Sequence, residues 1–142
     1  MNVYMEIARL VAQLSDEPSR HTSAVFVSAD GTNIIASAAN HSLPKLMWHE
    51  ERFQKPKKYL YIEHAERNAI YDACRRGVSL KGSTVYLPWF PCVECARALA
   101  LVGIKNMVCV EPNWNEERYN FLDAKAILEE SGVRIKYVDL AS

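Results

Sequence analysis

The chain has 142 residues, 49% of them hydrophobic, which is the size and composition of one compact domain spanning residues 1–142. Its 17 basic and 17 acidic side chains cancel, so no general field draws it onto nucleic acid or an anionic membrane. No apolar run approaches the roughly 20 residues of a membrane span, and the first residues do not read as a secretory signal. We therefore expect a cytoplasmic protein, with no nucleic-acid or membrane partner and with reduced cysteines.

The N-terminal part of the chain predicts a helix followed by a hairpin. Apolar residues recur at helical spacing over 3–14, and Pro18 closes this segment. Two short apolar runs, 23–28 and 33–38, flank a turn sequence that contains Gly31. We expect these two runs to pair as antiparallel strands.

Beyond the hairpin, residues 41–59 lose any regular pattern and predict an irregular excursion. The rest of the chain alternates between the two kinds of element, with helices expected at 63–76, 92–102 and 116–131 and strands at 84–87, 106–111 and 133–140. This order predicts an α/β fold in which a five-stranded mixed sheet, with its last strands parallel, is covered by helices on both faces.

Two short motifs, each at the start of an expected helix, combine side chains that bind metals. They are His64-Ala65-Glu66 and Pro91-Cys92-Val93-Glu94-Cys95. Catalytic zinc takes three nitrogen or sulfur ligands from the protein and leaves its fourth position to water, a number that His64, Cys92 and Cys95 supply. Because Cys92 and Cys95 are three residues apart, they share one face of a helix. All three donors converge only if both helices point their N-termini at the same ion.

Glu66 is the candidate proton carrier beside this ion. Zinc with two thiolates and a neutral imidazole carries no formal net charge, so it acidifies its water less than an all-histidine site does. A neighbouring base is then needed, and a carboxylate that does not ligate the metal can take and return a proton. The three metal donors together with Glu66 suit a hydrolysis in which water attacks an amidine-like carbon and ammonia is released. H-x-E together with P-C-x-x-C is the known signature of zinc nucleobase deaminases.

From about residue 15 to residue 139, the sequence resembles the cytidine and deoxycytidylate deaminase superfamily. The sequence HAERNAI at 64–70 looks like the H-A-E-x-N-A-I form typical of the deoxycytidylate branch, and FPCVECA at 90–96 is similar to F-P-C-x-E-C-A. The resemblance implies a three-layer α/β/α sandwich, a Zn²⁺ cofactor held by the His and both Cys, and Glu66 as proton shuttle. It also implies hydrolysis of dCMP to dUMP and ammonia, by an enzyme that forms homo-oligomers, either dimers or hexamers.

The same resemblance assigns contacts to a small-molecule nucleotide or nucleobase substrate. Asn40 corresponds to the residue that meets the sugar, and the backbone amide of Ala65 to the group that meets the pyrimidine carbonyl. Trp89 and Phe90 are candidates for walling the base, although such aromatic residues are equally common in a core. The sequence departs from the regulated members at Ala38-Ala39-Asn40-His41, where those carry Gly-Tyr-Asn-Gly, so allosteric control by nucleoside triphosphates is not expected.

Several alternatives stay open at this stage. The substrate is dCMP or another base or nucleoside, namely cytosine, cytidine, guanine, a modified pyrimidine or adenosine in transfer RNA, and a non-catalytic zinc-binding module is the rival outside enzymes. The basic cluster of Arg52, Lys55, Lys57 and Lys58 is either solvated loop charge or a phosphate grip, with Arg20 as a second phosphate candidate. We expect Cys74 and Cys109 to be inert core residues.

Overall fold

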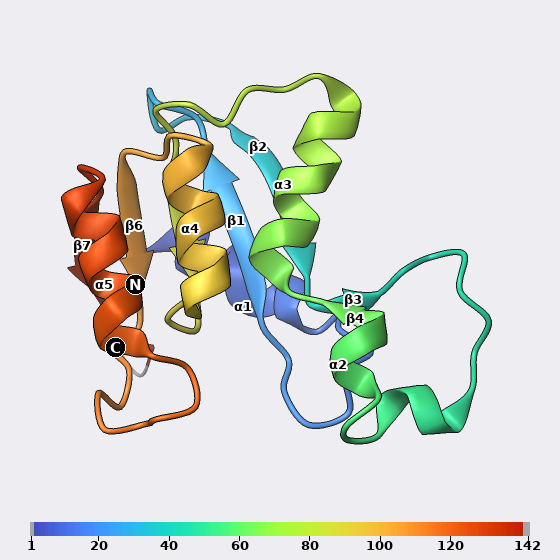
Figure 1. Ribbon diagram of the computed structural model, residues 1–142. Helices are drawn as coiled ribbons and strands as arrows, with labels where there is room; N and C mark the ends of the chain where they lie inside the picture. Colours follow the sequence, from blue (N-terminus) through green and yellow to red (C-terminus); the bar gives the residue numbers. More distant parts are fainter. Residues whose placement is uncertain (1, 141–142) are drawn as a thin grey trace.

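The computed structural model describes residues 2–140, which form a five-stranded mixed sheet with strand order β2-β1-β5-β6-β7 (Figure 1). The strands are β1 (Ser23–Val27), β2 (Ile34–Ala39), β5 (Thr84–Leu87), β6 (Asn106–Cys109) and β7 (Arg134–Tyr137). β1 runs antiparallel to both β2 and β5, whereas β5, β6 and β7 are parallel to one another. The predicted α/β fold, with its last strands parallel, is confirmed.

Helices cover both faces of this sheet because side chains alternate along each strand. Ala24 and Phe26 of β1 belong to the core beneath the larger helical layer, while Val25 and Val27 face the opposite core. The larger layer consists of α3 (Ala65–Arg76), α4 (Val93–Leu101) and α5 (Phe121–Glu130), and α1 (Val3–Ala12) covers the other face (Figure 1). No helix within residues 2–140 reaches the length and apolarity that crossing a membrane would require.

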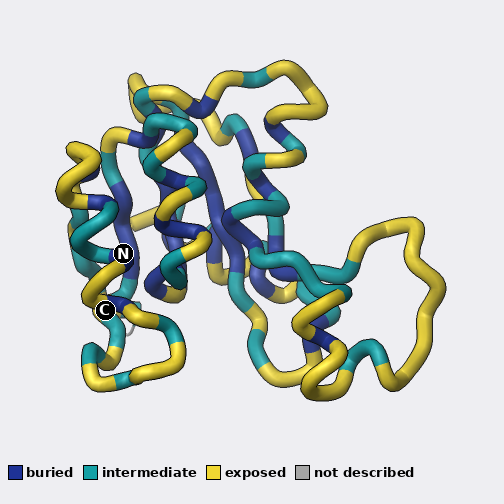
Figure 2. The backbone as a smooth tube through the Cα atoms, viewed as in Figure 1, coloured by how far each residue is buried: buried dark blue, intermediate teal, exposed yellow. Residues whose placement is uncertain are grey.

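The expected excursion projects from the body of the protein, and much of it is exposed (Figure 2). It contains β3 (His41–Ser42), the 3₁₀ helix η1 (Glu50–Phe53), the short helix α2 (Lys58–Tyr61) and β4 (Ile62–Glu63). Its two ends pair as a small antiparallel sheet, with His41 opposite Glu63. The sequence pattern did not predict this pairing, and it delivers the chain directly into α3.

The last helix begins at Phe121 and not at Glu116, so its predicted start is wrong by five residues. The Glu116 carboxylate accepts hydrogen bonds from the backbone N–H and the guanidinium of Arg118, which offers the backbone an alternative to the helix. Asn120 then adopts a left-handed conformation with φ 51°. Helical geometry starts only after that residue.

Two side chains lie elsewhere than the sequence predicts. Cys74 is exposed, because it follows the buried Ala73 by one position and a helix turns each successive side chain onto a different face. Lys58 is buried, although both interpretations of the basic cluster required an accessible charge. Cys109, in contrast, is fully buried in the core as expected.

Candidate metal centre and reaction cavity

The first turns of α3 and α4 bring the three predicted metal donors together. His64 is the N-cap residue of α3, Cys92 is the N-cap residue of α4, and Cys95 lies in the first turn of α4. His64 Nδ1 lies 3.5 Å from Cys92 Sγ and 3.3 Å from Cys95 Sγ. The ligand atoms of the three residues all lie within 4.8 Å of one another. The two helices therefore point their N-termini at one position, as the spacing of the motifs requires.

This donor set fits zinc. One imidazole nitrogen and two sulfurs are the ligands that Zn²⁺ prefers, and a site with three protein ligands keeps a position open. Within residues 2–140, no fourth His, Cys, Asp or Glu joins the group. A purely structural zinc site is normally closed by four protein ligands. The geometry is thus that of a site with room for a water molecule.

Hydrogen bonding among the donors already favours a negative charge at this point. The pKa of Cys92 is held well below its usual range because the Cys95 thiol and His64 donate hydrogen bonds to its sulfur. The same bond from Cys95, together with burial, raises the pKa of the Cys95 thiol. The hydrogen bond to Cys92 also raises the pKa of His64. The N-termini of the two helices thus surround a Cys92 thiolate, whose negative charge suits the binding of a cation.

A cavity of about 90 Å³ opens beside these donors. It is bordered by every residue that the sequence analysis assigned to the site except Cys95, namely Asn40, His64, Ala65, Glu66, Trp89, Phe90 and Cys92. Glu66 is only 7% exposed, and burial raises the pKa of its carboxyl. The cavity therefore brings a buried carboxyl group together with two of the three metal donors.

Asn40 holds the chain segment that leads into β1. Its Oδ1 accepts a hydrogen bond of 3.0 Å from the backbone N–H of Thr22, and its Nδ2 donates one of 2.9 Å to the backbone oxygen of Arg20. An asparagine amide offers two N–H groups and two lone pairs on its oxygen. One donor and one acceptor therefore stay available to a ligand in the cavity.

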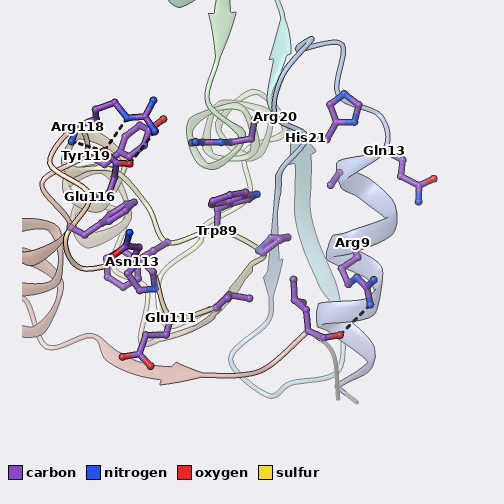
Figure 3. Close-up of a pocket in the computed structure, with 17 residues that line it drawn as sticks. Arg9, Gln13, Arg20, His21, Trp89, Glu111, Asn113, Glu116, Arg118 and Tyr119 are labelled. Carbon is purple, nitrogen blue, oxygen red and sulfur yellow. Dashed lines mark hydrogen bonds and ion pairs between the residues drawn. The ribbon is translucent and has the colours of Figure 1, made fainter.

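Arg20 contacts two aromatic rings, and all three side chains line the cavity. Its guanidinium carbon is 4.5 Å from the centre of the Trp89 ring and 5.0 Å from that of Tyr119 (Figure 3). Phe90 has a different role, because it is 5% exposed and packs edge-on against Trp114 and Phe121 in the core. Trp89 and Phe90 thus both line the cavity, but Trp89 is half-exposed whereas Phe90 is buried.

A larger hollow of about 650 Å³ lies next to this cavity and shares Arg20, Trp89 and Tyr119 with it (Figure 3). Its lining contains none of the three metal donors and does not contain Glu66. The smaller cavity is therefore the candidate reaction site. Phe90 and Phe121 also line both the larger hollow and the smaller cavity.

An α/β/α sandwich whose metal donors meet at two helix N-termini beside a buried carboxyl group defines a zinc-binding protein of the deaminase class. Residues 1–111 match the family model described as the cytidine and deoxycytidylate deaminase zinc-binding region. The chain belongs to this family. Family membership and the donor set together identify zinc as the cofactor.

Individual relatives share about 30% of their residues with this chain. The chain is 31% identical over 120 residues to a deoxycytidylate deaminase of Mus musculus, a match that covers 80% of this chain and 65% of the mouse protein. The deoxycytidylate deaminase of Homo sapiens is 30% identical over the same coverage. The chain thus spans about two-thirds of the length of these curated relatives.

Among solved structures, the fold is similar to that of the dCMP deaminase of the cyanophage S-TIM5 in complex with dCMP and dUMP. The TM-score is 0.77 at 24% sequence identity, and the match covers 96% of this chain and 94% of the phage chain. At this identity the comparison establishes the shared fold.

Proposed function

We propose that this protein is a zinc-dependent hydrolase that converts dCMP and water to dUMP and ammonia. One observation carries the proposal: the buried Glu66 carboxyl borders the same cavity as His64 and Cys92, beside a metal site with room for water. The similarity to deoxycytidylate deaminases supports the choice of substrate. So does the phage enzyme of the same fold, whose structure contains dCMP and dUMP.

Protons are moved by Glu66 in this mechanism. His64, Cys92 and Cys95 would hold the zinc ion, which supplies the activation that makes water a nucleophile at neutral pH. The water oxygen bonds to C4 of the cytosine ring, and the bond from C4 to the amino group breaks. Glu66 transfers one proton of the water to ring N3 and the other to the leaving amino group, which departs as ammonia. The raised pKa of Glu66 suits a group that must both accept and return protons.

The backbone at the start of α3 offers a contact to the base. Ala65 is the first residue of the helix, so its N–H has no partner within α3. It borders the cavity and is available to donate to the carbonyl oxygen of the pyrimidine ring. We assign the sugar hydroxyl to Asn40, through the amide donor and acceptor that the chain itself leaves free.

We assign the phosphate to Arg20, the one arginine or lysine among the described residues that lines both the reaction cavity and the hollow beside it. A hollow of about 360 Å³ shares Arg20, Asn40, His64 and Tyr119 with the reaction cavity. Among the described residues, Arg20 forms stacking contacts but no ion pair, whereas Arg118 is paired with Glu116 at 2.9 Å. Lys58, the buried member of the basic cluster, is paired with Glu17. The positive charge of Arg20 is therefore free to bind an anion.

The experiment that tests the proposal is ammonia release from zinc-loaded protein. A panel of dCMP, deoxycytidine, CMP, cytidine, cytosine, guanine and a transfer RNA separates the rival substrates. We expect turnover of dCMP with higher kcat/KM than of deoxycytidine. Full zinc occupancy with no ammonia from any member of the panel would contradict the proposal and favour a binding module.

A further inference from the structure

One guanidinium group connects the two segments that carry the metal donors. Arg67, in the first turn of α3, donates from Nε to Glu63 at 2.8 Å, and its Nη2 lies 2.7 Å from the same carboxylate. Its Nη1 donates to Glu94 of α4 at 2.8 Å. Glu63 directly precedes His64, and Glu94 lies between Cys92 and Cys95. A single side chain thus spans the gap between the histidine donor and the two cysteine donors.

Glu63 also fixes the backbone of the histidine donor. Its Oε1, which accepts from Arg67, accepts a hydrogen bond of 2.8 Å from the backbone N–H of His64. His64 is the N-cap residue of α3, and its side chain makes no capping hydrogen bond. The imidazole is therefore free to face the metal, while the position of its backbone is set by the carboxylate that Arg67 holds.

The arrangement is stronger than an ordinary surface ion pair. Arg67 and Glu63 are only 22% and 23% exposed, and the planar guanidinium contacts two carboxylates at once. The only other member, Glu94, is 60% exposed. α3 and α4 pack beside each other at this end of the sheet, so Arg67 bridges their N-termini where the metal donors meet.

We infer that Arg67 is a positioning residue for the zinc site, which holds the N-termini of α3 and α4 at the separation that lets His64, Cys92 and Cys95 share one ion. The inference rests on the zinc site of the proposed function and not on turnover. Groups that orient metal ligands change metal affinity by about 10–100-fold when they are removed. Losing the bridge should therefore speed zinc release. It should also lower the Tm of the zinc-loaded protein more than that of the apoprotein.

The test compares Arg67→Met with Arg76→Met. Arg76 lies in the same helix and pairs with Asp72 at 2.9 Å, far along α3 from the metal donors. Zinc release is followed with the chromogenic chelator 4-(2-pyridylazo)resorcinol, and thermal unfolding is measured on both the zinc-loaded and the apoprotein. We expect Arg67→Met to bind zinc about 10–100-fold more weakly than the parent protein and therefore to release it faster, and Arg76→Met to match the parent protein.

Two further variants keep the test decisive. Glu94→Gln removes only the arm of the bridge that reaches α4, at an exposed position that tolerates the change, and should also speed zinc release. Arg67→Lys keeps the charge but loses the planar fork, so it should release zinc at a rate between those of the parent protein and Arg67→Met. In cobalt-substituted protein, the d–d absorption bands should change in Arg67→Met and not in Arg76→Met.

Zinc release at the parent rate in both Arg67→Met and Glu94→Gln would overturn the inference. Equal acceleration in Arg67→Met and Arg76→Met would do the same, because it would show a general loss of helix stability. None of these measurements uses ammonia release. A protein that loses zinc faster without the bridge but deaminates nothing would overturn the proposed function alone.

Discussion

Lys58 Nζ lies 2.6 Å from Glu17 Oε1, and both side chains are only 8% exposed. Lys58 comes from α2 in the projecting excursion, and Glu17 from the segment between α1 and β1. Lys58 also donates to Ser19 Oγ at 2.6 Å, and Glu17 accepts the backbone N–H groups of Ser19 and Arg20. This buried ion pair ties the excursion to the segment that carries Arg20.

Removing the lysine should therefore destabilise the protein strongly. Lys58→Met leaves the Glu17 carboxylate buried without its partner, which costs about 3–5 kcal/mol in comparable buried pairs. Lys57→Met is the matched control, because Lys57 pairs with Glu51 at 3.4 Å between side chains that are 50% and 67% exposed. Its effect should stay below about 1 kcal/mol. Urea unfolding measures the free energy of unfolding of both variants. Equal losses would contradict the assignment of Lys58 to a buried ion pair.

The same pair predicts how stability changes with pH. Burial alone raises the pKa of Glu17, but the hydrogen bonds from Lys58, Ser19 and Arg20 outweigh it, so the pKa lies below the ordinary 4.5. A group whose pKa is lower in the folded state contributes stability above its unfolded pKa and loses it as the pH falls through the folded one. The difference in free energy of unfolding between wild type and Glu17→Gln should therefore shrink as the pH falls below about 4.5. A difference that is constant with pH would exclude this contribution.

Glu66 should be needed for turnover and not for metal binding. Glu66→Gln keeps the three donors, so zinc content measured by atomic absorption should equal that of wild type. Ammonia release from dCMP should fall by about 10²–10⁴-fold, because the variant cannot accept a proton from water. Near-normal turnover would show that another group carries the proton.

Arg20 should affect nucleotides more than nucleosides. Arg20→Gln removes the charge that we assign to the phosphate, so KM for dCMP should rise by about 10–100-fold, the effect of one charge-assisted hydrogen bond. The kinetic constants for deoxycytidine should change little. Arg9→Gln, at an exposed arginine of the neighbouring hollow, provides a control that should leave both substrates unaffected. A similar loss for dCMP and deoxycytidine would place the phosphate elsewhere.

The cysteines should differ in their reactivity towards iodoacetamide. Cys74 is exposed and should be alkylated rapidly in the zinc-loaded protein. Cys109 is buried, and burial raises its pKa to about 12, so it should react only after unfolding. Removing zinc should expose Cys92 as an additional reactive thiolate, since its pKa is lowered by hydrogen bonds. Peptide mass mapping resolves the sites, and rapid labelling of Cys109 in the folded protein would contradict the packing described above.

Local patterns predicted much of the fold and the grouping of the metal donors. The continuous apolar run of β1 suits a strand that is buried on both faces of the sheet, and the apolar spacing on α1 follows from a backbone that repeats every 3.6 residues. The start of α5 could not be predicted in this way, because Glu116 binds Arg118 and Asn120 adopts a left-handed conformation. A helix that begins at Glu116 and one that begins at Phe121 both suit the apolar pattern, and only the local hydrogen bonds decide between them.

The types of donor and their spacing along the chain were enough to predict the available chemistry, because zinc requires particular ligands and the spacing within each motif fixes which side chains share a helix turn. Which charged groups pair beside that site became visible only in the folded chain. The partners Lys58 and Glu17 are 41 residues apart, and Arg67 and Glu94 are 27 apart. Neither pairing can be recognised from a periodic pattern in the sequence. Burial of a charge and the choice of its partner depend on how distant segments pack, which no local pattern records.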